Sequence, residues 1–184
     1  MLDREVNIDR RVKKTRQVLK DALISLMAEK DFSNITVQDI TRVADVNRAT
    51  FYSHYHDKID LIQKIAEEIL NELNAILMKK SDGLRSYDLL VQIFEHLSEH
   101  SEFYTIMLSS NRFPGFWKKL YAIFRNATSR STEFSDSDDS IPQDILNSYI
   151  LGAYFGVVIQ WIKRGMPYSP KYMAEKLANI KTVI

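Results

Sequence analysis

The chain has 184 residues, with 25 Lys and Arg against 24 Asp and Glu, and its formal net charge is +1. This length is sufficient for one or two small domains with a proper core, and so balanced a charge excludes a protein that holds nucleic acid through bulk charge. The absence of cysteine excludes disulfides, thiol nucleophiles and cysteine-ligated metal sites.

The N-terminal segment combines a run of cations with the beginning of an amphipathic helix. Six cations and no acid lie between Arg10 and Lys20, which is a pattern that a plain solvated face would also show. Apolar residues then recur with helical spacing at Leu19, Ala22, Leu23, Leu26 and Met27. The first eleven residues, MLDREVNIDRR, lack an apolar signal core, so we expect a cytoplasmic protein.

The next segment, TVQDITRVADVNRATFYSHYHDK, begins at Thr36 and contains two short helix patterns separated by a turn. Thr36 and Asp39 have the spacing of a capping box, which predicts the beginning of the first helix. Asp45 stands where the chain must turn, and Asp tolerates the left-handed backbone conformation better than most residues.

The second helix pattern follows Asn47, a residue type that caps helix N-termini well, and extends through Tyr55. Phe51 and Tyr55 are four residues apart, so both can face inward. The side chains left on the outer side are those of Arg48, Ala49, Thr50, Tyr52 and His54. Two helices joined by so short a turn form a helix-turn-helix, whose second helix can enter the major groove of DNA.

Lys58 occupies the first position of a third helix pattern, between Asp57 and Asp60, which resemble an N-cap pair. A cation there opposes the helix dipole at a cost of about 0.3–1 kcal/mol. Beside free backbone amides, however, a lysine can clamp a phosphate. The alternative is a solvated surface lysine.

The segment from about Arg11 to Leu70 resembles the DNA-binding domain of the TetR family of bacterial transcriptional regulators. The matching pieces are ITVQDI at 35–40, ADV at 44–46, RATFYSHY at 48–55 and DK at 57–58. One departure is Asp45, where the family usually has glycine.

The resemblance implies DNA contacts for nine residues. Base or nearby phosphate contacts are implied for Gln38, Arg48, Ala49, Thr50 and Tyr52, and contacts with the DNA backbone for Thr36, His54 and Lys58, with Asn47 beside them. Because the cations from Arg10 to Lys20 lead into the helix that precedes the helix-turn-helix, we favour phosphate contact for them over a solvated face.

The rest of the chain reads as helices, with one polar, acidic segment at Ser129–Ser140 that we expect to form a loop. The predicted helices lie at 58 to about 80, 85–100, 102–110, 114–130, 142–165 and 170–182, the last beginning at the Ser169 cap with Pro170. We therefore predict an all-α protein of the TetR type. It has a three-helix DNA-binding domain at 1–57 and a helical effector-binding and dimerisation domain at 58–184.

Bulky apolar side chains are frequent in the middle helices, which is also what an ordinary core requires. Ligand pockets are lined mostly by such residues, and the resemblance implies a small-molecule effector in this domain. The candidate pocket residues are Phe94, Phe103, Tyr104, Met107, Trp117, Tyr121 and Tyr154. We expect no cofactor.

The residues His96-Leu97-Ser98-Glu99-His100 fit the H-x-x-E-H pattern of some zinc enzymes. A metal-dependent hydrolase using His96, Glu99 and His100 is a remote alternative, and a regulatory metal site is another. Three fixed letters are a weak signal, so we expect exposed residues near a helix end, with neither a catalytic nor a metal site.

Residues 145–162 contain no charge, which raises the alternative of a membrane span. Because Asn147, Ser148 and Gln160 interrupt this stretch, we expect instead a helix buried between its own domain and a second copy of the chain. The candidate dimer residues are Tyr149, Gly152, Ala153, Gly156, Met173 and Leu177.

Together these features predict a homodimeric repressor that a small-molecule effector releases from a near-palindromic operator. A co-activator or interaction module that answers to a partner protein is the alternative.

Overall fold

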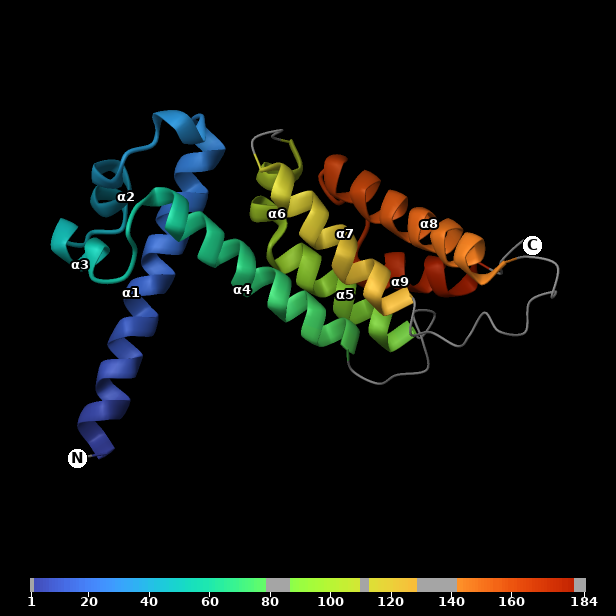
Figure 1. Ribbon diagram of the computed structural model, residues 1–184, viewed down its shortest axis with the longest axis horizontal. Coiled ribbons are helices and arrows are strands. Elements are labelled where there is room, and N and C mark those ends of the chain that lie inside the picture. The colour runs from blue at the N-terminus through green and yellow to red at the C-terminus, as the bar shows by residue number, and fades with distance from the viewer. Residues whose placement is uncertain (1, 79–86, 110–112, 129–141, 181–184) are drawn as a thin grey trace. The chain divides into compact units, whose positions relative to one another are not determined.

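The computed structural model describes residues 2–78, 87–109, 113–128 and 142–180, and every regular element within these ranges is helical (Figure 1). The all-α prediction is therefore confirmed. In chain order the helices are α1 (Leu2–Glu29), η1 (Phe32–Asn34), α2 (Val37–Val43), α3 (Arg48–Tyr52), α4 (Lys58–Met78), α5 (Tyr87–Glu99), α6 (Ser101–Ser109), α7 (Pro114–Thr128), α8 (Gln143–Lys163) and α9 (Pro170–Asn179).

The chain forms two compact units, Met1–Glu68 and Ile69–Ile184, which we call unit 1 and unit 2. The division falls within α4, so this one helix contributes residues to both units. The expected domain boundary at 57/58 lies at the beginning of the same helix.

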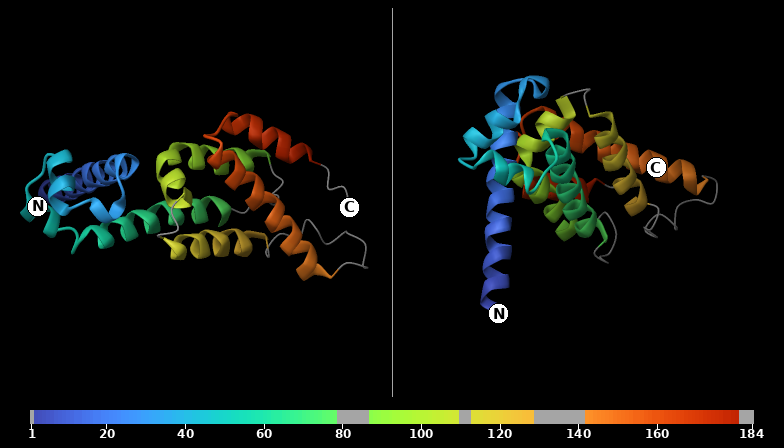
Figure 2. Two further views of the ribbon diagram at one scale, coloured as in Figure 1. Left: turned by 90° about the horizontal axis from the view of Figure 1, so that it is seen from above. Right: turned by 60° about the vertical axis from the view of Figure 1, so that its left-hand side comes forward.

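In unit 1, α2 packs against α1, and α3 packs against α2 (Figures 1 and 2). Its core is apolar because the helical spacing of Leu19, Leu23 and Leu26 turns all three side chains inward. Ile40 of α2 and Phe51 of α3 are fully buried and complete this core.

The turn between α2 and α3 forms as the side chains predict. Thr36 caps α2, with its hydroxyl accepting from the Asp39 N–H at 3.1 Å and the Asp39 carboxylate accepting from the Thr36 N–H at 3.0 Å. Asp45 has a φ of 51°, which confirms the expected left-handed conformation. The Asn47 side chain then accepts from the Ala49 N–H at 2.8 Å and caps α3.

In unit 2, α9 packs along α5, while α6 and α7 pack against α8 (Figure 2). Aromatic contacts join these helices. Phe94 of α5 meets Trp161 of α8 edge-on, with the ring centres 5.1 Å apart. The ring centres of Phe103 of α6 and Phe116 of α7 are 5.5 Å apart. The Trp161 indole N–H also donates to the Tyr168 carbonyl, which links the end of α8 to the segment before α9.

Every helix expected after residue 58 is present, and several of the predicted ends lie outside the described residues. The prediction for α3 was too long, because this helix ends at Tyr52, although Tyr55 still turns inward and is buried as expected. The acidic segment Ser129–Ser140 lies outside the described residues.

The α8 helix is long and apolar enough to cross a membrane by length and composition alone, yet only 33% of its most apolar stretch is buried within the chain. Core helices of soluble proteins pass the same test, so this helix by itself is weak evidence for a membrane span.

Candidate nucleic-acid interface

The exposed face of α3 carries the residues expected to read DNA. Arg48 and Ala49 are exposed, Tyr52 is 47% exposed, and Thr50 is half-buried. The Arg48 guanidinium lies 5.6 Å from the centre of the Tyr52 ring and donates to its hydroxyl at 3.2 Å. Because this bond uses one of five guanidinium donors, Arg48 keeps the donors needed for a bidentate contact with guanine.

The other polar candidates fall into two groups. Gln38 is exposed on α2, whereas the side chains of Thr36 and Asn47 are engaged in capping α2 and α3. Capping fixes where each helix begins and thus how the exposed face of α3 is presented. Direct DNA contact by Thr36 or Asn47 stays a prediction.

His54 follows α3 and packs against Tyr55, with the ring centres 6.2 Å apart. Burial lowers the pKa of His54 below its ordinary value of 6.5, and the charge of Arg16 lowers this pKa further. The imidazole is consequently neutral at pH 7 and would meet a phosphate as an N–H donor. Because the charge of Arg16 acts on His54, the basic run of α1 lies close to the end of α3.

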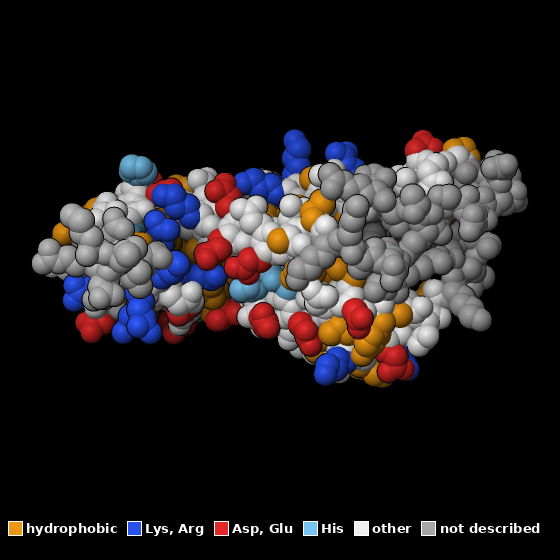
Figure 3. Space-filling view, turned by 90° about the horizontal axis from the view of Figure 1, so that it is seen from below, with side chains coloured by type: hydrophobic (Ala, Val, Ile, Leu, Met, Phe, Trp, Pro, Cys, Tyr) orange, Lys and Arg blue, Asp and Glu red, His pale blue; other side chains and the backbone are white. Residues whose placement is uncertain are grey.

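That basic run forms one wall of a groove of about 620 Å³ within unit 1. The groove is lined by Lys13, Arg16, Gln17, Lys20, Tyr55, Lys64, Ile65 and Glu68. On the face drawn in Figure 3, Lys and Arg side chains gather over the helices of unit 1. Such a concentration of cations suits a polyanion even though the whole chain is nearly neutral.

Lys58 makes contacts that sequence reasoning did not foresee. Its ammonium group donates to the backbone carbonyls of Phe32, Ser33 and Ile35, at 2.8, 3.0 and 2.6 Å, and lies 4.9 Å from the centre of the Phe32 ring. An ammonium has three donors, so these carbonyls use all of them. Lys58 therefore connects the beginning of α4 to the turn before α2 through hydrogen bonds. Phosphate contact by its side chain stays a prediction.

The candidate effector residues differ in their burial. Phe94, Phe103, Tyr104 and Met107 are at most 2% exposed and pack within the core. Trp117 and Tyr121 of α7 instead meet Phe155 of α8, which sequence reasoning did not single out, with ring centres 5.7 and 5.8 Å apart. Tyr154 packs beside Leu146 and Ile150.

Most of the candidate dimer residues form a stripe on the exposed face of α8. Tyr149 is 59% exposed, and Gly152, Ala153 and Gly156 are exposed one and two turns further along. Met173 of α9 is half-buried. Leu177 is buried within its own chain, and its contact with a second copy stays a prediction.

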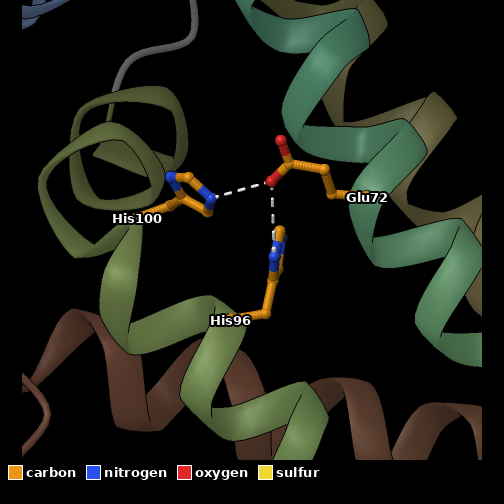
Figure 4. A group of neighbouring side chains, drawn as sticks. All are labelled: Glu72, His96 and His100. Atoms are coloured by element: carbon orange, nitrogen blue, oxygen red, sulfur yellow. Dashed lines mark hydrogen bonds and ion pairs between the residues drawn. The ribbon is translucent and has the colours of Figure 1, made fainter.

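The histidines of the H-x-x-E-H pattern also differ from expectation, because His96 is buried and not exposed. The carboxylate that meets them belongs to Glu72 of α4, whereas Glu99 is exposed (Figure 4). Sequence reasoning missed Glu72, which lies 24 and 28 positions from the two histidines. The arrangement that the hydrolase alternative requires, with Glu99 beside both histidines, is not the one found.

Family models match both parts of the chain. Residues 19–65 match the family described as bacterial regulatory proteins, tetR family, and residues 85–182, more than half of the chain, match a transcriptional regulator C-terminal region. Among solved structures, the dihydroxyacetone kinase operon activator DhaS is similar, with a TM-score of 0.64 and 21% identity over 90% of this chain and 93% of that one. A TetR transcriptional regulator from Streptococcus agalactiae has a TM-score of 0.61 and 24% identity, covering 96% and 98% of the two chains.

Curated relatives include an HTH-type regulator of Bacillus subtilis, YxbF, 43% identical over 39% of this chain and 19% of its own length. The negative transcriptional regulator IcaR of Staphylococcus epidermidis is 29% identical over 46% of each chain. This chain thus spans less than half of these two relatives. The transcriptional activator DhaS of Lactococcus lactis is 26% identical over 68% of this chain and 70% of its own. From the helix-turn-helix in unit 1 and the family matches in both units, the chain belongs to the TetR family and is a DNA-binding transcriptional regulator.

Proposed function

We propose that this regulator is a homodimeric repressor that works in the cytoplasm and binds a near-palindromic operator. The exposed face of α3, with Arg48 held beside Tyr52, carries the proposal. Two such helices, one from each copy, would enter successive major grooves about 34–36 Å apart. The symmetry of the operator then mirrors the symmetry of the dimer.

The proposed contacts divide into those that read sequence and those that hold position. Arg48, Gln38, Thr50 and Tyr52 read base edges, with Ala49 in apolar contact beside them. Phosphates are held by neutral His54 as an N–H donor and by the basic groove of unit 1, supported by the lowered pKa of His54 and the cations that line this groove. Thr36 and Asn47 are proposed to reach the DNA backbone while they cap their helices.

The proposed dimer forms through the exposed face of α8. This face combines the large exposed side chain of Tyr149 with Gly152 and Gly156, and an added Cβ at either glycine would meet nothing within 4 Å in its own chain. Small residues four apart let a second helix approach closely. A second copy would thereby cover the apolar surface that this chain leaves exposed.

A small-molecule effector is proposed to act on unit 2. The aromatic group of Trp117, Tyr121 and Phe155 supports this assignment, because Tyr121 is 43% exposed and links the group to the surface. An effector that prefers one conformation of the dimer shifts the population toward it and away from the DNA-binding form. The chemical identity of the effector does not follow from these residues.

The second candidate function is activation of transcription instead of repression. The match that extends furthest along the chain among the three curated relatives above is to a protein named as an activator, DhaS, whereas IcaR is named as a negative regulator. A co-activator that answers to a partner protein would use the same α3 face and a different surface of unit 2.

The test is to select genomic fragments that the purified protein binds and to place the enriched site before a reporter gene. We expect one near-palindromic sequence to be enriched, and reporter expression to rise when the regulator is deleted. Expression that falls on deletion would establish an activator. Fragments enriched without a shared sequence would contradict the proposal that α3 reads an operator.

A further inference from the structure

Two histidines and a glutamate converge within unit 2 (Figure 4). His96 lies in the last turn of α5 and is 5% exposed, and His100 follows directly after this helix. Both imidazoles point toward one carboxylate oxygen of Glu72 on the neighbouring turn of α4 (Figure 4). An ordinary ion pair needs only one of these histidines.

The distances suit a small metal ion. The Glu72 Oε2 atom lies 3.1 Å from Nε2 of His100 and 3.9 Å from Nδ1 of His96, and the three ligand atoms all lie within 4.8 Å of one another. Ligand atoms bound tetrahedrally at about 2.0–2.2 Å from Zn²⁺ are roughly 3.3 Å apart. Small side-chain rotations therefore suffice to bring all three atoms to bonding distance.

A further contact orients the buried imidazole. The other ring nitrogen of His96, Nε2, lies 3.1 Å from the hydroxyl of Tyr104, which is itself fully buried. When Nδ1 binds a metal, Nε2 carries the proton and can donate it to this hydroxyl, the kind of support that metal-binding histidines usually have.

We propose that Glu72, His96 and His100 form a binding site for a divalent transition metal ion, with Zn²⁺ as the best fit. Two imidazole nitrogens and one carboxylate are ligands that Zn²⁺ favours, whereas Mg²⁺ and Ca²⁺ take oxygen ligands. Three protein ligands leave a fourth position open to water or to a coordinating small molecule. The proposal concerns unit 2 alone and does not depend on the DNA-binding assignment.

The experiment uses the tag-free, full-length protein after treatment with a chelator. Calorimetric titration with Zn²⁺ should give one ion per chain with a sub-micromolar Kd, and Co²⁺ should produce the visible absorption of a four-coordinate site. The primary variants are Glu72→Gln and His100→Gln, because both side chains are at least partly exposed and the buried His96 is left in place. Each variant should weaken Zn²⁺ binding at least tenfold.

Two further variants distinguish Zn²⁺ binding at this site from nonspecific Zn²⁺ binding by other histidines, and test the role of Tyr104. His56→Ala removes an exposed histidine of unit 1 and should leave the Zn²⁺ affinity unchanged. Tyr104→Phe keeps all three ligands and should weaken binding by about tenfold or more through loss of orientation. Absence of saturable Zn²⁺ binding to the wild type, or equal affinity in the wild type, Glu72→Gln and His100→Gln, would overturn the proposal. Neither result bears on operator binding, since the titration contains no DNA.

Discussion

Lys58 joins the beginning of α4 to the turn before α2 through three charge-assisted hydrogen bonds. Its position at the first residue of a helix looks unfavourable when only the helix dipole is considered. The carbonyls of Phe32, Ser33 and Ile35 offset that cost, because hydrogen bonds to charged groups are among the stronger ones in proteins.

We predict that Lys58→Met lowers the free energy of unfolding by about 1–3 kcal/mol, because it leaves the three carbonyl oxygens without their charged donor. Urea denaturation followed by circular dichroism measures this change. Lys64→Met on the same helix is the matched control, because Lys64 is half exposed and its hydrogen bond goes to Asp60 in the preceding turn.

The Lys58→Met variant also tests whether Lys58 holds DNA. A structural role leaves the salt dependence of operator binding unchanged, whereas loss of a phosphate contact reduces its slope by about one unit. A variant with unaltered stability and a reduced slope would contradict the role that the hydrogen bonds indicate.

The carboxyl group of Asp39 should make the folding stability depend on pH in the acid range. Its pKa is held well below the ordinary value of 3.8, chiefly by the Thr36 N–H, then by the Thr36 hydroxyl and by Lys30. A carboxyl whose pKa is lowered on folding contributes stability that is present above pH 3.8 and is lost as the pH falls through the folded-state value.

The Asp39→Asn variant should therefore be less stable than the wild type at pH 5–7, and the difference should shrink below pH 3.8. Urea denaturation at several pH values measures it, with Asp21→Asn on the exposed side of α1 as the control. A difference that stays constant down to pH 2.5 would show that the charge of Asp39 does not stabilise the α2 cap.

Among the described helices, α8 combines an apolar sequence with an exposed face. Its stripe of Tyr149, Gly152, Ala153 and Gly156 is exposed, although the helix as a whole is apolar. Neither glycine is required by a close contact within the chain, since an added Cβ meets nothing within 4 Å.

Gly156→Leu should weaken the dimer without unfolding the monomer. Leucine has space in the isolated chain and a higher helix propensity than glycine, but its side chain would keep a second α8 from approaching. Light scattering coupled to size-exclusion chromatography should show the wild type as a dimer and the variant shifted toward the monomer. Gly115→Leu, at an equally open glycine in α7, should remain dimeric. Equal masses for all three proteins would place the dimer interface elsewhere.

The elements show which features can be predicted from sequence. Local patterns sufficed for the caps at Thr36 and Asn47 and for the left-handed Asp45, since each depends on residues within a few positions. Contacts between distant positions could not be predicted. Lys58 bonds to carbonyls 23–26 residues earlier, and Glu72 meets two histidines at the end of another helix. The burial of His96 and Leu177 depends likewise on helices that periodicity alone does not bring together.

For the whole molecule, the proposed regulation requires that one face of α3 recognises the operator. The continuous helix α4 supplies residues to unit 1 and to unit 2, which is the covalent route by which a ligand of unit 2 could influence DNA binding. Every regulatory proposal depends first on the reading of sequence by α3.

The most direct test measures the affinity of the wild type and of Arg48→Ala for the selected operator and for copies with single base changes. We predict that Arg48→Ala loses about 1–3 kcal/mol, or roughly 5–150-fold in Kd, and no longer discriminates at the base pair that Arg48 reads. Arg164→Ala, which removes the same charge from an exposed position in unit 2, should bind like the wild type. Unchanged affinity and unchanged discrimination in Arg48→Ala would contradict the assignment of α3 as the recognition helix.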